Sequence, residues 1–520
     1  MVSDRGSPSP WETQQNGVAR SRRAVSVLLT PNPESSQVLL VRRSPRLSFF
    51  GGYWAFPGGV LEPQDGKTPI THLPGTWSDL APFLVAAARE VFEETGVWLA
   101  GIPPGARELQ DYRSALLADE SSFADILHRT GRILDARTFV PLIRLETPNF
   151  SQRRYDTWFL MAPLPPESPF DIWPGELVEG FIITAGEALH RWHQGDLPIV
   201  PPVLLLLQEL QPRNCRTLAP RAQSLAKRCQ SGKLHRIAFS PGILVLPVRT
   251  RTLPPATHTN AYIVGEKNLY LVDPGPQEPW EREKIWELLD ELLAEGRSLD
   301  GILLTHHHPD HIGALEETLR RYRVPVLAHP LTLEWLARSG KALHHGQQLD
   351  LGAAPDGNPD WKLTVYHVPG HTDGHLAFQE TRYNGLLAGD TVSTISSIII
   401  DPDEGRLSTY LQSLKFLATL DLGFLYPGHG TPVRSARQYI LSALQHRQRR
   451  KEQLLSALRR HSLPLETLIE QVYTDVDRSL WPLAERSLRS GLMQLVEEGS
   501  AQETSPGRWR LAPGGEGHAV

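Results

Sequence analysis

The stretch LLTHHHPDHIGAL (303–315) gathers four histidines and an aspartate directly after an apolar run. Neutral imidazole and carboxylate are the usual protein ligands of zinc-like cations. The segment GILLT before them has the length and composition of a short buried strand. At the end of such a strand we expect His306 and His308 to project together, with Asp310 and His311 as a second set beside them. A run of solvated surface histidines is the alternative interpretation.

Three other stretches supply the groups that such a site still needs. They are VPGHTDGH with His371, GLLAGDTV with Asp390, and FLYPGHG with His429. Each is interpreted as an apolar strand that ends in a turn of small residues and delivers one metal-binding side chain. This repetition argues against the surface interpretation.

Together these motifs resemble the metallo-β-lactamase superfamily over roughly residues 236–440. The resemblance implies an αβ/βα sandwich that holds two metal ions, expected as zinc, with iron or manganese also suited to such ligands. The implied ligands are His306, His308 and His371 for one ion, Asp310, His311 and His429 for the other, and Asp390 as the bridge between them.

Two such cations lower the pKa of a shared water toward about 7 and polarise a carbonyl or phosphoryl oxygen. Hydrolysis of a thioester or a related ester is therefore the expected reaction, and Asp310 is given a catalytic role besides its ligand role. Asp273 matches a motif position of the superfamily and is interpreted as structural. His307 and His375 fall outside the ligand set and are expected either behind the ligands or on the surface. The pair His344–His345 is expected on the surface.

Residues 445–512 resemble the winged-helix module that follows the lactamase fold in the β-lactamase-like-protein-2 group, whose members include an endoribonuclease. Leu488, Leu492, Leu495 and Val496 are spaced as one apolar face of a helix. The basic run HRQRRK in this module offers a patch for RNA phosphates. Acidic residues balance its charge, so a packing or dimerisation face remains the alternative.

The stretch REVFEETGV (89–97) indicates a second chemistry. Glu90, Glu93 and Glu94 are spaced i, i+3 and i+4, so they share one face of a helix. Three carboxylates on one face repel each other unless a cation lies among them, and oxygen ligands of this kind suit magnesium or manganese. Arg89 lies four residues before Glu93 and is placed to orient it by an ion pair. An exposed acidic helix face is the alternative.

With FPGG upstream, this stretch resembles the Nudix box, which implies a Nudix α/β/α sandwich. Asp65 takes the place of the first glutamate of the box, and the spacer from there to Arg89 has 23 residues and is longer than in the simple box. The interruption and the stretch LLVRRSPRLSFFGGYWAFPGG are similar to the coenzyme A diphosphatase branch, although Ser48 stands where that branch has an arginine. The implied reaction is attack of water on a diphosphate linkage of a nucleotide or CoA-type substrate, with Glu93 and Glu94 in catalytic roles.

Composition sets the frame for these elements. A chain of 520 residues is long enough for about three domains, and its net charge of -5 gives no global reason to expect nucleic acid binding. Two cysteines allow no disulfide framework, and no apolar run approaches the roughly 20 residues of a membrane span. We expect a cytoplasmic protein without membrane contact, whose oligomeric state is open. The expected order is a polar tail (1–20), a Nudix domain (21–210), a linker or short helix (211–236), a metallo-β-lactamase domain (237–440) and a winged helix (445–512).

Three functional hypotheses remain open. In the first, one acyl-CoA is attacked at two bonds, at its thioester by the lactamase domain and at its diphosphate by the Nudix domain. In the second, the lactamase domain and the winged helix form an endoribonuclease, and the Nudix domain acts on nucleotides or RNA ends. In the third, the Nudix domain is a non-catalytic nucleotide sensor, although its complete set of glutamates argues against this.

Overall fold

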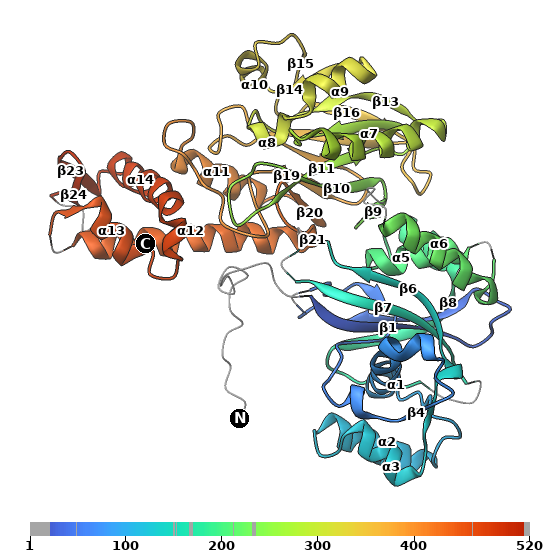
Figure 1. Ribbon diagram of the computed structural model, residues 1–520. Coiled ribbons are helices and arrows are strands. Elements are labelled where there is room, and N and C mark those ends of the chain that lie inside the picture. Colours follow the sequence, from blue (N-terminus) through green and yellow to red (C-terminus); the bar gives the residue numbers. More distant parts are fainter. Residues whose placement is uncertain are drawn as a thin grey trace. The chain divides into compact units, whose positions relative to one another are not determined.

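The computed structural model describes residues 21–47, 49–148, 151, 153–165, 170–211, 213–230, 236–459 and 461–513. The polar tail expected at residues 1–20 and Ser48 lie outside the described residues. The described chain forms two compact units, one within residues 18–241 and the other within residues 242–520. Figure 1 shows the first unit in blue to green and the second in green to red.

The first unit is built on two three-stranded sheets whose strands come from distant parts of the sequence. In one sheet β7 pairs with β1 in parallel and with β6 in antiparallel orientation. In the other, β2 lies between β3 and β8, and both pairings are antiparallel. The bounds are β1 (Arg22–Thr30), β2 (Gln37–Arg43), β3 (Trp54–Ala55), β6 (Val140–Glu146), β7 (Tyr155–Pro163) and β8 (Leu177–Thr184).

Helix α1 (Ala81–Thr95) packs into the core of this unit. Its apolar residues recur at helical spacing, and Phe83 and Phe92 are each at most 1% exposed. The helix ends at Thr95 because Gly96 adopts a φ of 72°, in the left-handed region that favours glycine. The helix predicted for REVFEETGV is therefore confirmed.

Shorter elements complete the first unit. β4 (Ile70–Thr71) and β5 (Leu134–Asp135) pair in parallel. The remaining elements are α2 (Ala106–Leu117), α3 (Phe123–Thr130), α4 (Ala185–His193), α5 (Pro201–Leu210), α6 (Leu218–Gln230), β9 (Ile237–Ala238) and the 3-10 helices η1 (Asp65–Lys67), η2 (Gly75–Leu80), η3 (Ala136–Thr138) and η4 (Cys215–Thr217). The segment expected as a linker or a short helix holds η4 and α6.

The second unit contains two larger sheets. Within this unit the first has the strand order β15-β14-β13-β12-β11-β10, and the second has the order β16-β17-β18-β19-β20-β21. The first sheet consists of β10 (Ile243–Arg249), β11 (His258–Val264), β12 (Asn268–Val272), β13 (Ser298–Leu303), β14 (Val326–Ala328) and β15 (Lys341–Ala342). The second consists of β16 (Gln348–Gly352), β17 (Trp361–His367), β18 (Leu376–Glu380), β19 (Gly385–Gly389), β20 (Phe424–Pro427) and β21 (Val433–Arg434).

Helices cover the outer faces of these sheets (Figure 1). α11 and α12 bury Leu414 and Ile440 against Leu386 and Leu425 of the second sheet. On the other side α7 buries its apolar face and is joined to α9 by a hydrogen bond between Trp286 and Thr318. The helices are α7 (Pro279–Ala294), α8 (Pro309–Ile312), α9 (Leu315–Tyr322), α10 (Pro330–Trp335), α11 (Leu407–Leu417) and α12 (Ala436–Leu458). The predicted αβ/βα sandwich is confirmed.

The ends of several strands meet at one edge of this sandwich. β13, β19 and β20 end directly before the histidine-rich loop, the Asp390 motif and the His429 motif. Backbone and side-chain hydrogen bonds join the two sheets there, from the Leu376 amide to the Thr305 carbonyl at 2.8 Å and from the Tyr262 hydroxyl to the Pro427 carbonyl at 2.6 Å. The sheets therefore bring together motifs as far apart in sequence as His306 and His429, which are 123 positions apart.

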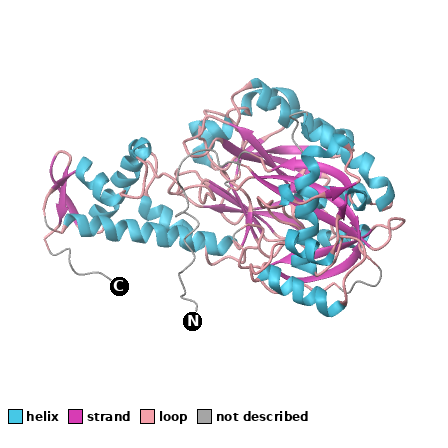
Figure 2. Cartoon of the chain, turned by 60° about the horizontal axis from the view of Figure 1, so that its bottom comes forward, coloured by secondary structure: helices cyan, strands magenta, loops and turns pink. Residues whose placement is uncertain are grey.

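The C-terminal part of the second unit is a small module of helices with a three-stranded sheet in the order β22-β24-β23. Figure 2 shows the long helix α12 leading to this module and the magenta hairpin at its far end. The further elements are β22 (Leu463–Pro464), α13 (Leu465–Val472), η5 (Arg478–Leu480), α14 (Trp481–Glu497), β23 (Ala501–Ser505) and β24 (Arg508–Leu511).

The apolar face predicted on α14 is confirmed for three of its four residues. Leu488, Leu492 and Leu495 are at most 1% exposed, whereas Val496 is 46% exposed. Consecutive residues of a helix are about 100° apart, so Val496 lies roughly 80° from Leu488, at the border of the apolar stripe. The prediction for Val496 is wrong for this reason.

Within the described residues, each helix is either too short or too polar to cross a lipid bilayer.

We predict that Leu492→Ala weakens the C-terminal module, because it opens a cavity in a core that excludes water. The free energy of opening of α14, measured by hydrogen exchange, should fall by about 2–5 kcal/mol. The neighbouring Met493 is 45% exposed, so Met493→Ala should change it by less than about 0.5 kcal/mol. Equal effects of the two substitutions would contradict the described core.

Candidate active sites

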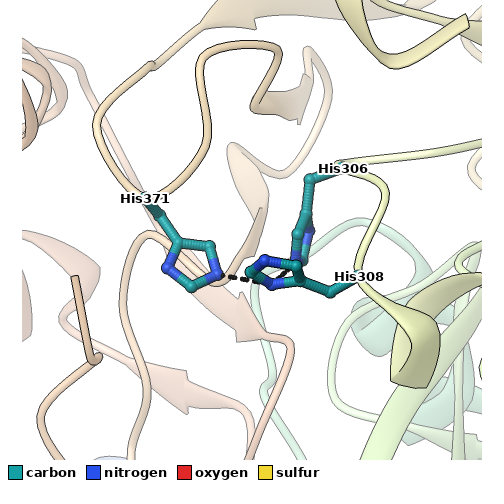
Figure 3. A group of neighbouring side chains, drawn as sticks. All are labelled: His306, His308 and His371. Atoms are coloured by element: carbon teal, nitrogen blue, oxygen red, sulfur yellow. Dashed lines mark hydrogen bonds between the residues drawn. The ribbon is translucent and has the colours of Figure 1, made fainter. Parts of the chain in front are cut away.

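Three histidines from two loops form one group of ring nitrogens in the second unit (Figure 3). The loop after β13 supplies His306 and His308, and the loop before β18 supplies His371. His308 Nδ1 lies 3.0 Å from His306 Nε2 and 3.0 Å from His371 Nε2. Three converging imidazole nitrogens are the donor set of a zinc-like ion.

A second group combines Asp310, His311 and His429. Asp310 and His311 lie in α8, and His429 follows β20. The Asp310 Oδ2 atom is 3.5 Å from His429 Nε2 and 4.0 Å from His311 Nε2. The three ligating atoms thus lie close enough to hold one cation together.

Asp390 lies between the two groups. Its Oδ1 atom is 3.4 Å from His311 Nε2 and 3.4 Å from His429 Nε2. Its Oδ2 atom is 3.6 Å from His371 Nε2. The two oxygens of one carboxylate therefore face different histidine groups, which is the arrangement of a bridging ligand.

The outward ring nitrogens of His306 and His311 are both tied to Asp273. Its carboxylate accepts from the Thr305 amide at 2.8 Å, from the Thr305 hydroxyl at 2.6 Å and from His311 Nδ1 at 2.8 Å. Since the Thr305 hydroxyl donates its one hydrogen to Asp273, it accepts from His306 Nδ1, at 2.9 Å. Asp273 thus keeps the hydrogens of both rings on Nδ1 and leaves Nε2 as the inward lone pair.

The other three histidines are held in the same way. The acceptors are the Glu404 carboxylate for His308 Nε2, the Ile399 carbonyl for His371 Nδ1 and the His258 carbonyl for His429 Nδ1, at 2.9, 3.0 and 2.9 Å. Because each of these nitrogens donates outward, the nitrogen that faces the centre carries a lone pair. The arrangement selects the metal-binding tautomer of each ring.

Burial and mutual charge set the protonation of this centre. Burial lowers the pKa of His371 to about 4, with His308 adding to the effect, so the ring is neutral. Burial favours the neutral form of Asp390, but His429 and His311 outweigh it and hold the pKa of this carboxyl well below its usual range. Burial also lowers the pKa of His311, yet Asp390 and Asp310 outweigh it and raise this pKa well above the ordinary value. Both shifts thus reflect the attraction between this imidazole and this carboxylate, whose facing atoms are 3.4 Å apart.

The residues fit the metal ions that the sequence implies. His311 Nε2 and Asp390 Oδ1 are buried without a hydrogen-bond partner, and they face each other. A buried polar atom without a partner costs free energy, which a cation between the two atoms would relieve. Gly428 allows this packing, because a Cβ atom there would lie 2.4 Å from Asp390 Oδ1 and 2.9 Å from the His311 ring.

His375 and His307, which are not among the expected ligands, lie beside the two groups. His375 Nε2 accepts from the Asp390 amide at 3.1 Å, and its ring stacks on His306 with centroids 4.9 Å apart. His307 stacks instead on Trp335, with centroids 4.4 Å apart. His375 therefore holds the backbone of Asp390, whereas His307 stacks on a side chain outside the two groups.

Sequence reasoning missed two residues of this centre, and the exposed pair His344–His345 is outside it. Thr305 directly precedes the histidine motif, so its position at the strand end was a usable signal. Glu404 is 96 residues from His308 and belongs to no motif. Only the fold places Glu404 beside a predicted ligand.

In the first unit, Arg89 of α1 is 3% exposed and joins several carboxylates. Its guanidinium donates to both oxygens of Asp65, at 3.2 and 3.1 Å, and to the Val60 carbonyl at 2.9 Å. It also donates to Glu90 at 3.0 Å and to Glu93 at 3.2 Å. The contact between Arg89 and Asp65 closes the long spacer between these two positions of the motif.

The three glutamates of α1 are partly buried carboxylates with raised pKa values. Burial raises the pKa of Glu90 to about 7, against the opposing effect of Arg89. Burial likewise raises the pKa of Glu93, and it raises that of Glu94 well above its usual range although the Gly58 amide donates to it at 2.8 Å. In the described part of the chain these glutamates are not among the groups whose ligating atoms gather within 4.8 Å.

Comparison with known proteins gives three family matches along the chain. A NUDIX domain matches residues 20–159, the metallo-beta-lactamase superfamily matches residues 254–429, and a beta-lactamase associated winged helix domain matches residues 465–509. The hydroxyacylglutathione hydrolase of Aeromonas hydrophila is 33% identical over 220 residues, which are 41% of this chain and 78% of that protein. The chain belongs to the metallo-beta-lactamase superfamily.

Two further similarities concern different parts of the chain. An atrochrysone carboxyl ACP thioesterase of Passalora fulva is 26% identical over 227 residues, 41% of this chain and 63% of that protein. The crystal structure of a NUDIX hydrolase from Alicyclobacillus acidocaldarius covers 37% of this chain and 92% of that chain, with 25% identity and a TM-score of 0.33. The predicted order of Nudix, lactamase and winged-helix domains is confirmed, and the chain is a hydrolase.

We predict that Asp273→Asn lowers the zinc affinity of the lactamase domain by about 10–100-fold. The amide group of asparagine would place an N–H against one of the groups that now donate a hydrogen bond to Asp273. The fold should persist, because Asp273 has a φ of 50° and asparagine tolerates that conformation. Competition with a chromogenic chelator measures the affinity. Asp300→Asn is the control, on an exposed residue of β13. Unchanged affinity in Asp273→Asn would refute the orienting role.

We predict that Asp65→Asn destabilises the Nudix domain, because it removes a carboxylate from a buried ion pair whose side chains are 4% and 2% exposed. Breaking such a pair on one side costs about 3–5 kcal/mol. Hydrogen exchange of the α1 amides should report this loss. Asp79→Asn, on an exposed residue of η2, should leave exchange unchanged. A silent Asp65→Asn would mean that Glu90 and Glu93 suffice to balance Arg89.

Proposed function

We propose that the lactamase domain is a binuclear metal hydrolase that cleaves a thioester. The observation that carries this proposal is the position of Asp390, whose two carboxylate oxygens face two separate histidine groups. In this proposal His306, His308 and His371 hold one ion, Asp310, His311 and His429 hold the other, and Asp390 bridges them. Zinc fits these ligands best, and iron or manganese also suit them.

The chain prepares this centre for hydrolysis through its own side chains. Cations bound there would supply a water of lowered pKa and polarise the carbonyl oxygen of the substrate. Asp310 is held by the Thr259 hydroxyl at 3.3 Å and lies beside His429, so it is placed to orient that water and accept its proton. The outward hydrogen bonds of the histidines keep the rings fixed during the reaction.

Two observations support a thioester as the substrate. Relatives of this domain are named as an ACP thioesterase and a hydroxyacylglutathione hydrolase. In addition, the large apolar side chains of Leu331 and Trp335 are 45% and 56% exposed on α10, and Trp335 stacks on His307 of the ligand loop. Exposed apolar surface beside the centre suits the acyl part of such a substrate.

For the Nudix domain we propose hydrolysis of a diphosphate linkage in a nucleotide or CoA-type substrate. Glu90, Glu93 and Glu94 would hold magnesium or manganese, with Glu93 and Glu94 in catalytic roles. Their partial burial and raised pKa values support this, because a cation would offset the cost of ionising them. Arg89 spans Asp65, Glu90 and Glu93 and would keep the carboxylates in place as the cation binds.

An acyl-CoA contains both bonds, so one substrate would serve both domains. The alternative of RNA as the substrate would need the basic run of the winged helix to face solvent. Three of its side chains are occupied within the chain: Arg447 donates to the Ile398 carbonyl, Arg450 contacts the Val472 carbonyl and Asp475, and Lys451 pairs with Glu498. These contacts favour the packing interpretation of that run.

We predict that the protein with magnesium and zinc cleaves an acyl-CoA at both bonds, as identified by mass spectrometry. Asp390→Ala should lower the rate of free CoA release more than about 100-fold. This loss is larger than the one expected when a residue that only hydrogen-bonds to a ligand is changed. It should spare formation of phosphoadenosine phosphate and acyl-phosphopantetheine, which Glu94→Gln should abolish instead.

The crossed pattern of the two variants serves as its own control. An acyl-CoA that both sites leave intact would refute the joint substrate, and metal-dependent cleavage of single-stranded RNA that Asp390→Ala removes would favour the ribonuclease. Tight nucleotide binding without turnover would favour a sensor role for the Nudix domain.

A further inference from the structure

The segment 398–408 connects the metal centre to the winged helix. It follows the bridging Asp390 and ends in the first turn of α11. Two of its residues accept hydrogen bonds from histidines of the centre. The Ile399 carbonyl accepts from His371 Nδ1 at 3.0 Å, and the Glu404 carboxylate accepts from His308 Nε2 at 2.9 Å. The segment thus sets the tautomer and ring orientation of two of the three histidines in one group.

The segment lies tightly on the loop that carries His371. The Arg406 amide donates to the Gly370 carbonyl at 2.9 Å. A Cβ atom at Gly405 would lie 2.3 Å from that same carbonyl oxygen and 2.7 Å from the His371 carbonyl oxygen, so only glycine fits. The Glu404 and Gly405 amides both donate to the Asp401 carbonyl, which closes a turn. Glu404 is presented to His308 by this turn.

The winged helix holds the other side of the same segment. Ser490 of α14 donates to the Ile400 carbonyl, and Ser490 is 4% exposed. Glu497, also on α14, accepts from Arg406 at 3.0 Å and from the Ser408 hydroxyl at 2.7 Å. These contacts alternate along the segment with those to the metal centre.

Two more contacts come from the winged helix and from the helix that leads to it. Arg486 of α14 pairs with Asp401 at 3.5 Å. Arg447 of α12 is 9% exposed and donates to the Ile398 carbonyl. Burying an arginine without a hydrogen-bond partner costs free energy, so the folded chain favours this contact. Side chains of α12 and α14 thus contact the segment along its whole length, from residue 398 to residue 408.

We propose that the winged helix is a structural part of the metal centre, and that Glu404 is a positioning residue for His308. By clamping the segment 398–408, α14 holds Glu404 and the Ile399 carbonyl against the outward nitrogens of His308 and His371. The winged helix then raises the metal affinity of the lactamase domain without touching a metal ion. This inference rests on the proposed ligand set and is independent of the substrate.

The role of Glu404 is tested by zinc affinity, measured on the full chain by chelator competition, and by zinc content per chain. Glu404→Ala should lower the affinity by about 10–100-fold. Glu404→Gln should lower it less, because the amide oxygen still accepts from His308. Wild-type affinity in Glu404→Ala would overturn the proposal.

A separate outcome would give Glu404 a different role. His307, His308 and Glu404 also place ligating atoms within 4.8 Å of one another. If Glu404→Ala lost an additional zinc ion per chain and left the affinity of the other two unchanged, Glu404 would be a ligand of its own site, and the positioning role would be overturned.

The role of the winged helix is tested by the double variant Ser490→Ala, Glu497→Ala, which removes three contacts to the segment. We expect its zinc affinity to fall by about 10-fold. The matched control is Glu485→Ala with Ser487→Ala, on the same helix, where Glu485 pairs with Arg489 of α14. Thermal unfolding of metal-free protein shows whether both variants fold alike.

The two perturbations should also be coupled. Since the clamp acts partly through Glu404, adding Glu404→Ala to the double variant should cost less than the product of the separate fold-changes. Equal zinc affinities of the double variant and its control would overturn the role of the winged helix. A protein that binds zinc as expected and cleaves no thioester would fail the substrate proposal alone.

Discussion

The lactamase centre depends on one constraint, which is that a buried histidine can present a lone pair inward only if its other nitrogen has an acceptor outside. Five such acceptors are needed around this centre, and the chain takes one from strand β11 and the other four from loops. Asp273 alone serves two rings through its own carboxylate and the Thr305 hydroxyl. The close junction of the two sheets at this edge is therefore a requirement of the chemistry as well as of the packing.

The Nudix domain must also hold ionisable side chains in place, but there the groups are acidic and their protein partner is a cation. Here partly or fully buried carboxylates take the place of imidazoles, and a single guanidinium joins three of them. Asp65 is the partner that the interrupted motif keeps, although a long insertion separates it from α1 in sequence. Arg89 can hold this arrangement because its planar group offers five donors in fixed directions. The arrangement leaves Glu94 apart, bound to the Gly58 amide.

The fold and the grouping of the histidine and aspartate side chains could be predicted from sequence because their signals are local. Apolar strands run directly into the histidine and aspartate motifs, and the glutamates of α1 lie within one helical turn of each other. The outer contacts could not be predicted in this way. Glu404 reaches His308 only after the chain has folded across the second sheet, and Val496 lies at a stripe border that spacing alone does not resolve. Arg447 likewise donates to a backbone carbonyl, that of Ile398, and every residue type has such a carbonyl, so the sequence gives no signal for this contact.

Helix α12 belongs to two cores at once. Ala436 and Ile440 pack in the lactamase core, whereas Leu454 and Leu458 pack in that of the winged helix. No loop interrupts the helix between them, so its length fixes the angular phase of one core against the other. One inserted residue would turn the following chain by about 100° and advance it by about 1.5 Å, which would carry α14 off the segment 398–408. Apart from Arg447, the middle of α12 should therefore tolerate changes of residue type far better than changes of length, because its length sets the spacing and orientation of the two cores.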